Sequence, residues 1–342
     1  MPAVRPFRAL RYDPALAGPL DSLVAPPYDV ISDAQRLEYL ERSPYNVVHL
    51  TLPDSEEQAA RDLADWRAQG VLAEAPEGYW WVAQDYTGPD GVARTREGFA
   101  ASVPAVPYED GVVLPHERTH AGPKEGRLRL LRATRTQLEP IFLLYDADPV
   151  LERPSGEPAA DVEEGGVRTR IWPVAGGELE LGTPLLIADG HHRYETAVTY
   201  REEQPAATHT LAILVSSRAP GLEIFPTHRI VKHVGNVPGD EVDEPGDGVT
   251  LYRSGKYLRV RTDDDFGPRV VESFQPEGVS YTPYAADAVA AVDRGDAEAA
   301  FLLEPVTVAQ VAEFAERGET MPQKSTFFYP KLTSGLLLFP VG

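Results

Sequence analysis

The sequence predicts a protein of the α/β or α+β class with two or three domains. The chain has 342 residues, of which 42% are hydrophobic, and this is enough for more than one buried core. Apolar and β-branched runs typical of strands alternate with segments that have helix caps and helical spacing. No segment repeats. This alternation favours mixed helices and strands over an all-β architecture.

The first hundred residues predict a short series of elements that ends in a hairpin. We expect an extended segment at 4–12, a Pro-rich loop at 24–32, a helix capped by Ser32 or Asp33 with Leu37 and Leu40 on its apolar side, a strand at 45–52, a helix capped by Asp54 or Ser55 that ends at Gly70, and a β-hairpin at 79–103 that turns at Pro89-Asp90-Gly91.

The remainder continues the alternation. We expect a helix at 124–135, a buried strand at 140–148, an acidic loop at 149–166, strands in VRTRIWPV and GELELGTPLLIADG, a helix at 191–203 and a strand at 211–217. After residue 218 the chain has strand-like LEIFPTHRIVKH and KYLRVRTD, a helix then a strand in AADAVAAVDRGDAEAAFLLEP, and a helix at 306–318.

Composition excludes several classes of function. The chain has 53 acidic and 32 basic residues, a net charge of −21, so general nucleic-acid binding is disfavoured. It has no cysteine, which excludes disulfides, thiolate catalysis and cysteine-ligated metals. No apolar run has the length of a membrane helix, and the N-terminus has no signal-peptide core. We therefore expect a cytoplasmic protein that binds neither membranes nor nucleic acids.

The segment LPHERTHAGPKEG, residues 114–126, contains a match to the zinc-protease pattern H-E-x-x-H. That site needs one continuous helix to bring His116 and His120 to the same face. Ala121-Gly122-Pro123 follows at once and should break such a helix. Three interpretations stay open: a zinc peptidase, an accidental match in a polar loop, or a loop that presents Glu117 as a catalytic carboxylate.

The segment LLIADGHHRYETA, residues 185–197, predicts a strand, a turn and a helix. Such a strand delivers Asp189 to a sheet edge, and Gly190 permits close approach of a ligand. His191, His192 and Arg193 then fall in the first helical turn, where free N–H groups favour a phosphate. An acid beside a phosphate suggests a divalent ion held by Asp189. The alternative is that Asp189 only caps the helix.

Two further segments could contribute to a site. In MPQKSTFFYPKLTSG, residues 321–335, Lys324, Ser325 and Thr326 place a cation and two hydroxyls in a polar turn, which suits a carboxylate or a phosphate or forms a structural turn only. In VAPPYDVIS, Tyr28-Asp29 is either an addition to the site or a turn without chemistry.

Together these segments resemble a known family. Strand-DGHHR-helix resembles the phosphate-binding element of the ParB/sulfiredoxin-like superfamily, and it is most similar to the free L-serine kinase family, which pairs it with an upstream PHE segment. That family also carries a C-terminal stretch like ERGETMPQKSTFFYPK, and the three segments occur here in the same order. The whole chain looks like longer bacterial relatives of that kinase, described as a domain of unknown function.

The resemblance implies a fold and a domain organisation. It implies a ParB/sulfiredoxin-like nucleotide-binding core at 106–217, with an added N-terminal α/β region and hairpin at 1–105 and a C-terminal α+β domain at 218–342 that completes the site. The first 105 residues and the acidic insert at 149–166 depart from the compact kinase, and they leave the acceptor open.

The resemblance also implies roles for the site residues. Glu117 would be the general base for the serine hydroxyl, Asp189 would hold Mg²⁺, and His192 would join these two in catalysis. Gly190, His191, His192 and Arg193 would bind the nucleotide, ATP or ADP. His116, Lys324, Ser325 and Thr326 would bind the substrate, free L-serine, or the transferred phosphoryl group. These are parts that phosphoryl transfer requires.

The sequence thus predicts a Mg²⁺-dependent kinase that produces O-phospho-L-serine. Two alternatives from other classes stay open: a ParB-like regulator that binds or hydrolyses nucleotide, and the zinc metallopeptidase.

Overall fold

The computed structural model describes residues 2–117 and 121–341, with the backbone alone for Ala121 and Pro123. Internal contacts separate two compact units. Unit 1 holds the described residues of Met1–Pro115, Thr119–Leu222 and Pro330–Gly342, and unit 2 holds those of His116–Arg118 and Glu223–Tyr329. Each unit combines strands with helices, which confirms a mixed α/β class. The ParB/sulfiredoxin-like core stays a prediction.

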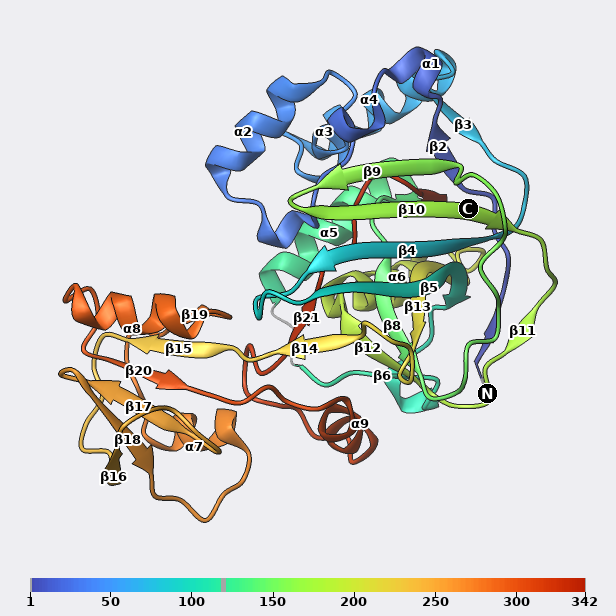
Figure 1. Cartoon of the computed structure of the whole chain (residues 1–342). Helices are drawn as coiled ribbons and strands as arrows, with labels where there is room; N and C mark the ends of the chain where they lie inside the picture. Colours follow the sequence, from blue (N-terminus) through green and yellow to red (C-terminus); the bar gives the residue numbers. More distant parts are fainter. Residues whose placement is uncertain (1, 118–120, 342) are drawn as a thin grey trace. The chain divides into compact units, whose positions relative to one another are not determined.

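The described part of unit 1 is built on a mixed eight-stranded sheet in the order β6-β12-β8-β13-β5-β4-β10-β9 (Figure 1). Its strands are β4 (Tyr79–Thr87), β5 (Ala93–Pro104), β6 (Val113–Leu114), β8 (Ile141–Tyr145), β9 (Ala160–Glu164), β10 (Val167–Val174), β12 (Leu185–Asp189) and β13 (His209–Ser216). β13 lies parallel to β8 and antiparallel to β5. Strands from both sides of residue 105 therefore share one sheet, and the division into three domains stays a prediction.

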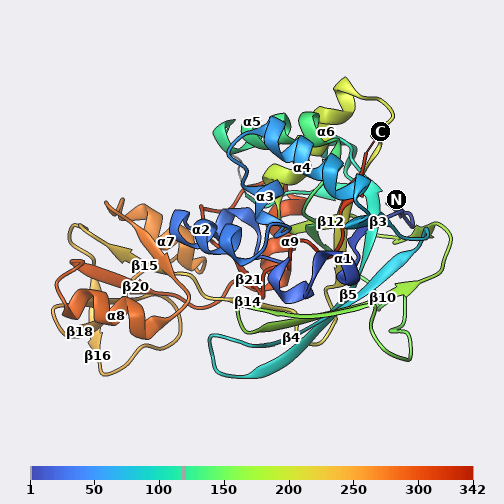
Figure 2. The same ribbon diagram turned by 90° about the horizontal axis from the view of Figure 1, so that it is seen from above.

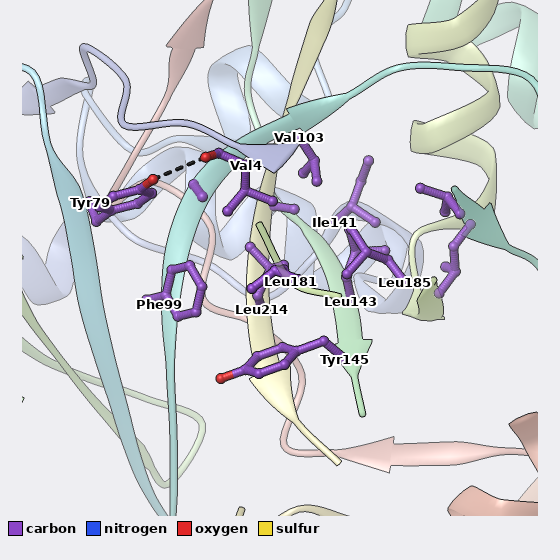
Figure 3. Close-up of a cluster of buried hydrophobic side chains, with 14 of the residues drawn as sticks. Val4, Tyr79, Phe99, Val103, Ile141, Leu143, Tyr145, Leu181, Leu185 and Leu214 are labelled. Carbon is purple, nitrogen blue, oxygen red and sulfur yellow. Dashed lines mark hydrogen bonds between the residues drawn. The ribbon is translucent and has the colours of Figure 1, made fainter. Parts of the chain in front are cut away.

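The sheet is buried on both faces at its centre. All five residues of β8 are buried, as the apolar run predicts. Ile141, Leu143 and Tyr145 point to one face, where they join the core cluster drawn in Figure 3. The hydroxyl of Tyr79 donates to the Val4 carbonyl at 3.0 Å, the dashed line in that view, and so ties the N-terminal segment to this core.

Helices of unit 1 cover the sheet. They are α1 (Pro14–Ala17), α2 (Asp33–Arg42), α3 (Val48–Thr51), α4 (Glu56–Ala68), α5 (Ala121–Thr134) and α6 (His191–Glu203), with 3₁₀ turns at Leu20–Ser22, Tyr28–Val30 and Tyr108–Asp110. α5 packs against both α4 and α6, and the three lie on one side of the sheet (Figure 2). The predicted caps are confirmed: the Ser32 and Ser55 side chains accept from Gln35 N and Gln58 N.

Short strand pairs complete unit 1. They are β1 (Ala3–Val4) with β11 (Leu179–Glu180), β2 (Leu10–Tyr12) with β3 (Leu72–Glu74), and β7 (Thr136–Gln137) with β22 (Phe339–Pro340). The last pair returns the C-terminal segment to unit 1 after the chain has passed through unit 2.

The described part of unit 2 has a six-stranded antiparallel sheet in the order β16-β18-β17-β20-β15-β19, and a separate pair of β14 with β21. Its elements are β14 (Glu223–Phe225), β15 (His228–Val231), β16 (Gly239–Val242), β17 (Thr250–Arg253), β18 (Lys256–Val260), α7 (Gly267–Ser273), β19 (Ser280–Thr282), α8 (Ala285–Asp293), β20 (Ala299–Leu302), α9 (Val308–Glu316) and β21 (Phe327–Tyr329). Phe301 of β20 joins the cluster with α7, whereas its neighbours Ala300 and Leu302 join the cluster with α8. The two helices therefore cover opposite faces.

Three predictions for unit 1 were wrong, besides the helix break predicted at Ala121-Gly122-Pro123, where α5 begins. The expected strand at 45–52 is the one-turn helix α3, the acidic loop at 149–166 contains the edge strand β9, and Leu37 of α2 is 58% exposed rather than apolar-packed. In β9 only Ala160 and Val162 face inward, a pattern too short to be recognised among acids. In the described residues no helix is both long and apolar enough to cross a bilayer.

Candidate functional site

Two of the three segments behind the resemblance contact each other in unit 2. Glu117 accepts a hydrogen bond from the backbone N–H of Lys324 at 3.1 Å, and His116 Nε2 lies 3.0 Å from the Thr326 hydroxyl. The His116 carbonyl also accepts from Met321 N at 2.9 Å. His116 is fully buried, and its ring packs beside Phe328. The PHE segment and the KST turn, more than 200 residues apart in sequence, thus form one hydrogen-bonded cluster.

The KST turn is held in a strained backbone conformation. Lys324 has φ +56°, a left-handed value that is unfavourable for a residue with a side chain. The Ser325 hydroxyl donates to the Pro322 carbonyl at 2.6 Å, and Arg229 donates to the Lys324 carbonyl at 3.4 Å. Arg229 is buried, and burial lowers the pKa of its guanidinium to about 10. The buried cation Arg229 therefore supports this turn, and sequence reasoning missed this residue.

The described part of HERTH does not have the geometry of a zinc protease. His116 and Glu117 precede the helix, which begins at Ala121, so Gly122 and Pro123 start a helix where the sequence predicted a break. His120 lies outside the described residues. Because His116 faces Thr326 rather than one side of a helix, it does not fit the paired-histidine ligand geometry.

The third segment lies in unit 1 and has the predicted strand–turn–helix form. β12 ends at Asp189, where the pairing with β8 shifts register, and a bulge of this kind re-aims a side chain at a sheet edge. Gly190 has φ +96° and begins α6. The positive φ favours glycine there, and a Cβ would lie 3.1 Å from Arg193 Nε, so a larger residue would also crowd the guanidinium.

Asp189 is paired with two cations. One carboxylate oxygen accepts from Lys331 Nζ at 2.7 Å and the other from Arg193 Nη2 at 2.7 Å. Burial alone would raise the pKa of Asp189, but Lys331 and Arg193 outweigh it and hold the pKa below its usual range. Lys331 is a site residue that sequence reasoning missed, although it ends the quoted KSTFFYPK stretch.

The histidines and the arginine of DGHHR follow Asp189 in the first turn of α6. His191 and Arg193 are 6% and 7% exposed, and His192 is partly exposed. Arg193 also donates to the Pro140 carbonyl, so its guanidinium turns back into the protein. His192 gives its carbonyl to the Thr196 hydroxyl at 2.7 Å, as part of the helix. The backbone N–H groups in the first turn of α6, rather than the Arg193 side chain, are therefore the candidate phosphate donors.

A buried carboxylate, Glu139, lies near Arg193. It accepts from Tyr28 N at 2.9 Å and from the Ser334 hydroxyl at 3.1 Å. Burial raises the pKa of Glu139, and Arg193 and Arg127 oppose that rise. Tyr28 begins a 3₁₀ turn and lies under the Arg127 guanidinium, so Tyr28-Asp29 forms a turn that touches this cluster. The choice between an addition to the site and a turn without chemistry stays a prediction.

Two cavities among the described residues do not by themselves mark a nucleotide site. A cavity of about 40 Å³ beside Glu139 and Arg193 has room for only a few water molecules. A cavity of about 470 Å³ in unit 2 has the size of a ligand site, but its lining includes the acids Asp263, Asp265 and Glu304. None of the predicted site residues lines it, and its charge disfavours phosphates, so we assign no nucleotide to it.

The contacts of Asp189 bear on the predicted Mg²⁺ site. Mg²⁺ prefers oxygen ligands, commonly one or two carboxylates together with phosphate oxygens. Both oxygens of Asp189 already accept from cations, and the described residues contain no group of three His, Asp or Glu placed to hold a metal. In this arrangement Asp189 does not fit a Mg²⁺ ligand.

Comparison with known proteins places the chain in a family. Residues 4–244 match the family described as a protein of unknown function, DUF1015. The chain belongs to this family. A search of curated proteins gave no match.

Solved structures provide only distant similarities for this DUF1015 member. It is similar to a free serine kinase variant in complex with AMP, with 15% identity, 66% of this chain and 89% of that chain covered and a TM-score of 0.42. It is also similar to truncated SbnI from Staphylococcus aureus, with 12% identity, 68% and 84% covered and a TM-score of 0.43. A conserved hypothetical protein from Pyrococcus furiosus matches at 16% identity, 66% and 92% covered, with a TM-score of 0.38. These values are too low to transfer a function.

Proposed function

We propose that this chain is a phosphotransferase that moves a phosphoryl group from ATP or ADP to the hydroxyl of free L-serine, giving O-phospho-L-serine. The observation that carries the proposal is the cluster in unit 2, where Glu117 and Lys324 are hydrogen-bonded at 3.1 Å. This cluster supports the resemblance to the kinase family. Two of the three segments that carry the resemblance contact each other, although they lie far apart in the sequence.

The proposal assigns the acceptor to the residues of unit 2. Glu117 accepts the proton of the serine hydroxyl as that oxygen attacks phosphorus. Lys324 neutralises charge on the transferred phosphoryl group, and the side chains of Ser325, Thr326 and His116 orient the amino acid. Glu117 is partly buried and accepts from a backbone donor, which holds its carboxylate beside the KST turn.

The proposal assigns the donor to the residues of unit 1. The start of α6, from Gly190 to Arg193, binds the nucleotide phosphates through backbone N–H groups, with His191 and His192 beside them. As the new bond between serine oxygen and phosphorus forms, the bond from phosphorus to the leaving phosphate oxygen breaks. The nucleotide leaves one phosphate shorter. Mg²⁺ belongs to the proposal as the ion that accompanies the nucleotide, and no step is assigned to it.

The test is nucleotide consumption with and without L-serine, for ATP and ADP in turn. Wild-type protein should consume nucleotide only when serine is present. Glu117→Gln should lower the rate by about 10²–10⁴-fold, the usual contribution of a general base. Glu244→Gln, at an exposed acid in a loop of unit 2, is the matched control and should keep the wild-type rate.

Two outcomes would contradict the proposal. Consumption that does not depend on serine and survives Glu117→Gln would favour the nucleotide-hydrolysing regulator. Zinc bound at one ion per chain, lost together with activity on chelation, would favour the metallopeptidase.

A further inference from the structure

The segment that follows the KST turn enters unit 1 with its backbone fixed at Pro330 and Lys331. Arg96 donates to the Pro330 carbonyl at 2.7 Å, and Gln84 donates to the Lys331 carbonyl at 3.1 Å. Arg96 and Gln84 are both 2% exposed and belong to β5 and β4 of the central sheet. The backbone of this segment is therefore held by two buried residues of the central sheet, while the Lys331 side chain stays 23% exposed.

The surroundings of Asp189 carry more positive than negative charge. Lys331 and Arg193 contact the carboxylate, and Arg96 interacts with it electrostatically. Three cations thus act on Asp189. Arg193 also interacts with Glu139, whose pKa burial raises, and with Asp29. A buried excess of cations is costly unless an anion completes it.

Arg96 is the least compensated of these cations. It shares one nitrogen between Gln84 and Pro330 and stacks over Phe142 at 4.5 Å, while its Nη1 is buried with no hydrogen-bond partner among the described residues. Burial lowers the pKa of Arg96 to about 9, and Asp189 opposes that shift. Arg96 thus combines a buried donor, which no described residue pairs, with an electrostatic interaction with Asp189, and such a donor can be satisfied by an anion.

We propose that Lys331 is a phosphate-contacting cation of an anion subsite in unit 1, and that Asp189 is the positioning residue that holds Lys331 rather than a ligand of Mg²⁺. Arg96 fixes the backbone of Lys331 and adds charge to the subsite. The inference rests on the proposed function for the identity of the ligand, a nucleoside diphosphate or triphosphate. The subsite itself requires only a phosphate anion.

Pyrophosphate tests the anion subsite separately from the proposed serine kinase activity, because its binding needs neither serine nor an adenosine site. Calorimetry with wild-type protein in EDTA should show binding without metal. Lys331→Met should weaken it at least tenfold, and Lys331→Arg should keep most of the affinity because it keeps the charge. Lys256→Met, at an exposed lysine paired with Glu241 at 2.8 Å, is the matched control and should bind like wild type.

Asp189→Asn distinguishes a positioning residue from a metal ligand. If Asp189 positions Lys331, the variant changes pyrophosphate affinity by the same factor with and without Mg²⁺, and the change disappears in the Lys331→Met background. If Asp189 binds Mg²⁺, the factor by which Mg²⁺ raises the affinity for pyrophosphate falls at least tenfold in the variant, and the inference is wrong. Circular dichroism and gel filtration confirm that each variant is folded.

The remaining outcomes also decide. No binding of pyrophosphate to wild-type protein, or no effect of Lys331→Met or of Asp189→Asn, would overturn the inference. Serine-independent nucleotide consumption together with the expected pyrophosphate results would leave the subsite in place and remove only the serine kinase.

Discussion

At the scale of single residues, the clearest feature is a contrast between two carboxylates. Glu117 accepts from the backbone N–H of Lys324 and is partly exposed, which suits a group that must accept a proton. Asp189 is held by two cations that lower its pKa, which suits a group that must stay charged. The residue types and the motifs in the sequence predicted that both acids belong to a site. They did not predict that the environments of the two acids differ.

Lys324 allows its backbone and its ammonium group to be tested separately. Glycine adopts φ +56° without strain, so Lys324→Gly should keep the turn and change the free energy of unfolding by no more than about 1 kcal/mol. Serine phosphorylation should nevertheless fall at least tenfold, because the cation that neutralises the phosphoryl group is lost. Steady-state rates beside urea unfolding measure both. A variant with wild-type activity would show that only the backbone of Lys324 matters.

His228 predicts acid sensitivity of unit 2. Its Nδ1 accepts from Leu303 N at 3.1 Å, and burial, with Arg229 as a second cause, lowers the pKa of His228 to about 4. The unfolded chain binds this proton near pH 6.5, so stability is complete above that pH and falls between pH 6.5 and 4. The loss should be about 1–3 kcal/mol.

His228→Asn keeps an acceptor for Leu303 N and removes the titration. Urea unfolding followed by far-UV circular dichroism should give a smaller loss of stability for this variant than for wild type between pH 6.5 and 4. Equal pH dependence of the two proteins would rule out His228 as the cause.

At the scale of elements, sequence reasoning succeeded where local signals and packing agree. The helices capped by Ser32 and Ser55, the hairpin of β4 and β5, and the strand–Gly–helix of DGHHR each have a local signal that fixes their ends. The strand predicted at 45–52 was wrong because the β-branched residues of this segment favour a strand, whereas tertiary contacts determine that it forms a helix. Nothing local in the sequence identifies Lys331 or Arg96, because Lys331 depends on Asp189 and Arg96 on Pro330, each more than a hundred residues away.

Asn46 is the residue that decides α3. It is fully buried, its amide donates to the carbonyls of Ser22 at 2.8 Å and Val24 at 3.2 Å, and its oxygen accepts from Val48 N at 3.0 Å. Asn46→Ala should cost about 2–3 kcal/mol because it leaves buried backbone groups unpaired. Asn236→Ala, at an exposed asparagine in unit 2, should cost less than about 0.5 kcal/mol. Denaturant midpoints compare them, and equal costs would mean that α3 does not depend on this side chain.

At the scale of the whole molecule, charge is distributed unevenly. The chain has a net charge of −21, yet Lys331, Arg193 and Arg96 gather around Asp189. Such a surface repels polyanions such as nucleic acids, while a local group of cations can still hold one small anion. The composition therefore fits a small phosphorylated ligand, which is the class that the proposed function requires.

The two compact units divide the predicted site residues between them. His116, Glu117 and the KST turn belong to unit 2, whereas DGHHR and Lys331 belong to unit 1. The sequence order of the three segments predicted that all would serve one reaction, and their placement in separate units makes this the central claim to test.

The most direct test is phosphorus NMR of the product. Wild-type protein with Mg²⁺, L-serine, and ATP or ADP in turn should produce the signal of O-phospho-L-serine. Glu117→Gln and Lys331→Met, one variant in each unit, should each reduce it at least tenfold, while Lys256→Met should leave it unchanged. No phosphoserine from wild-type protein with either nucleotide, or an undiminished signal from Glu117→Gln, would contradict the account.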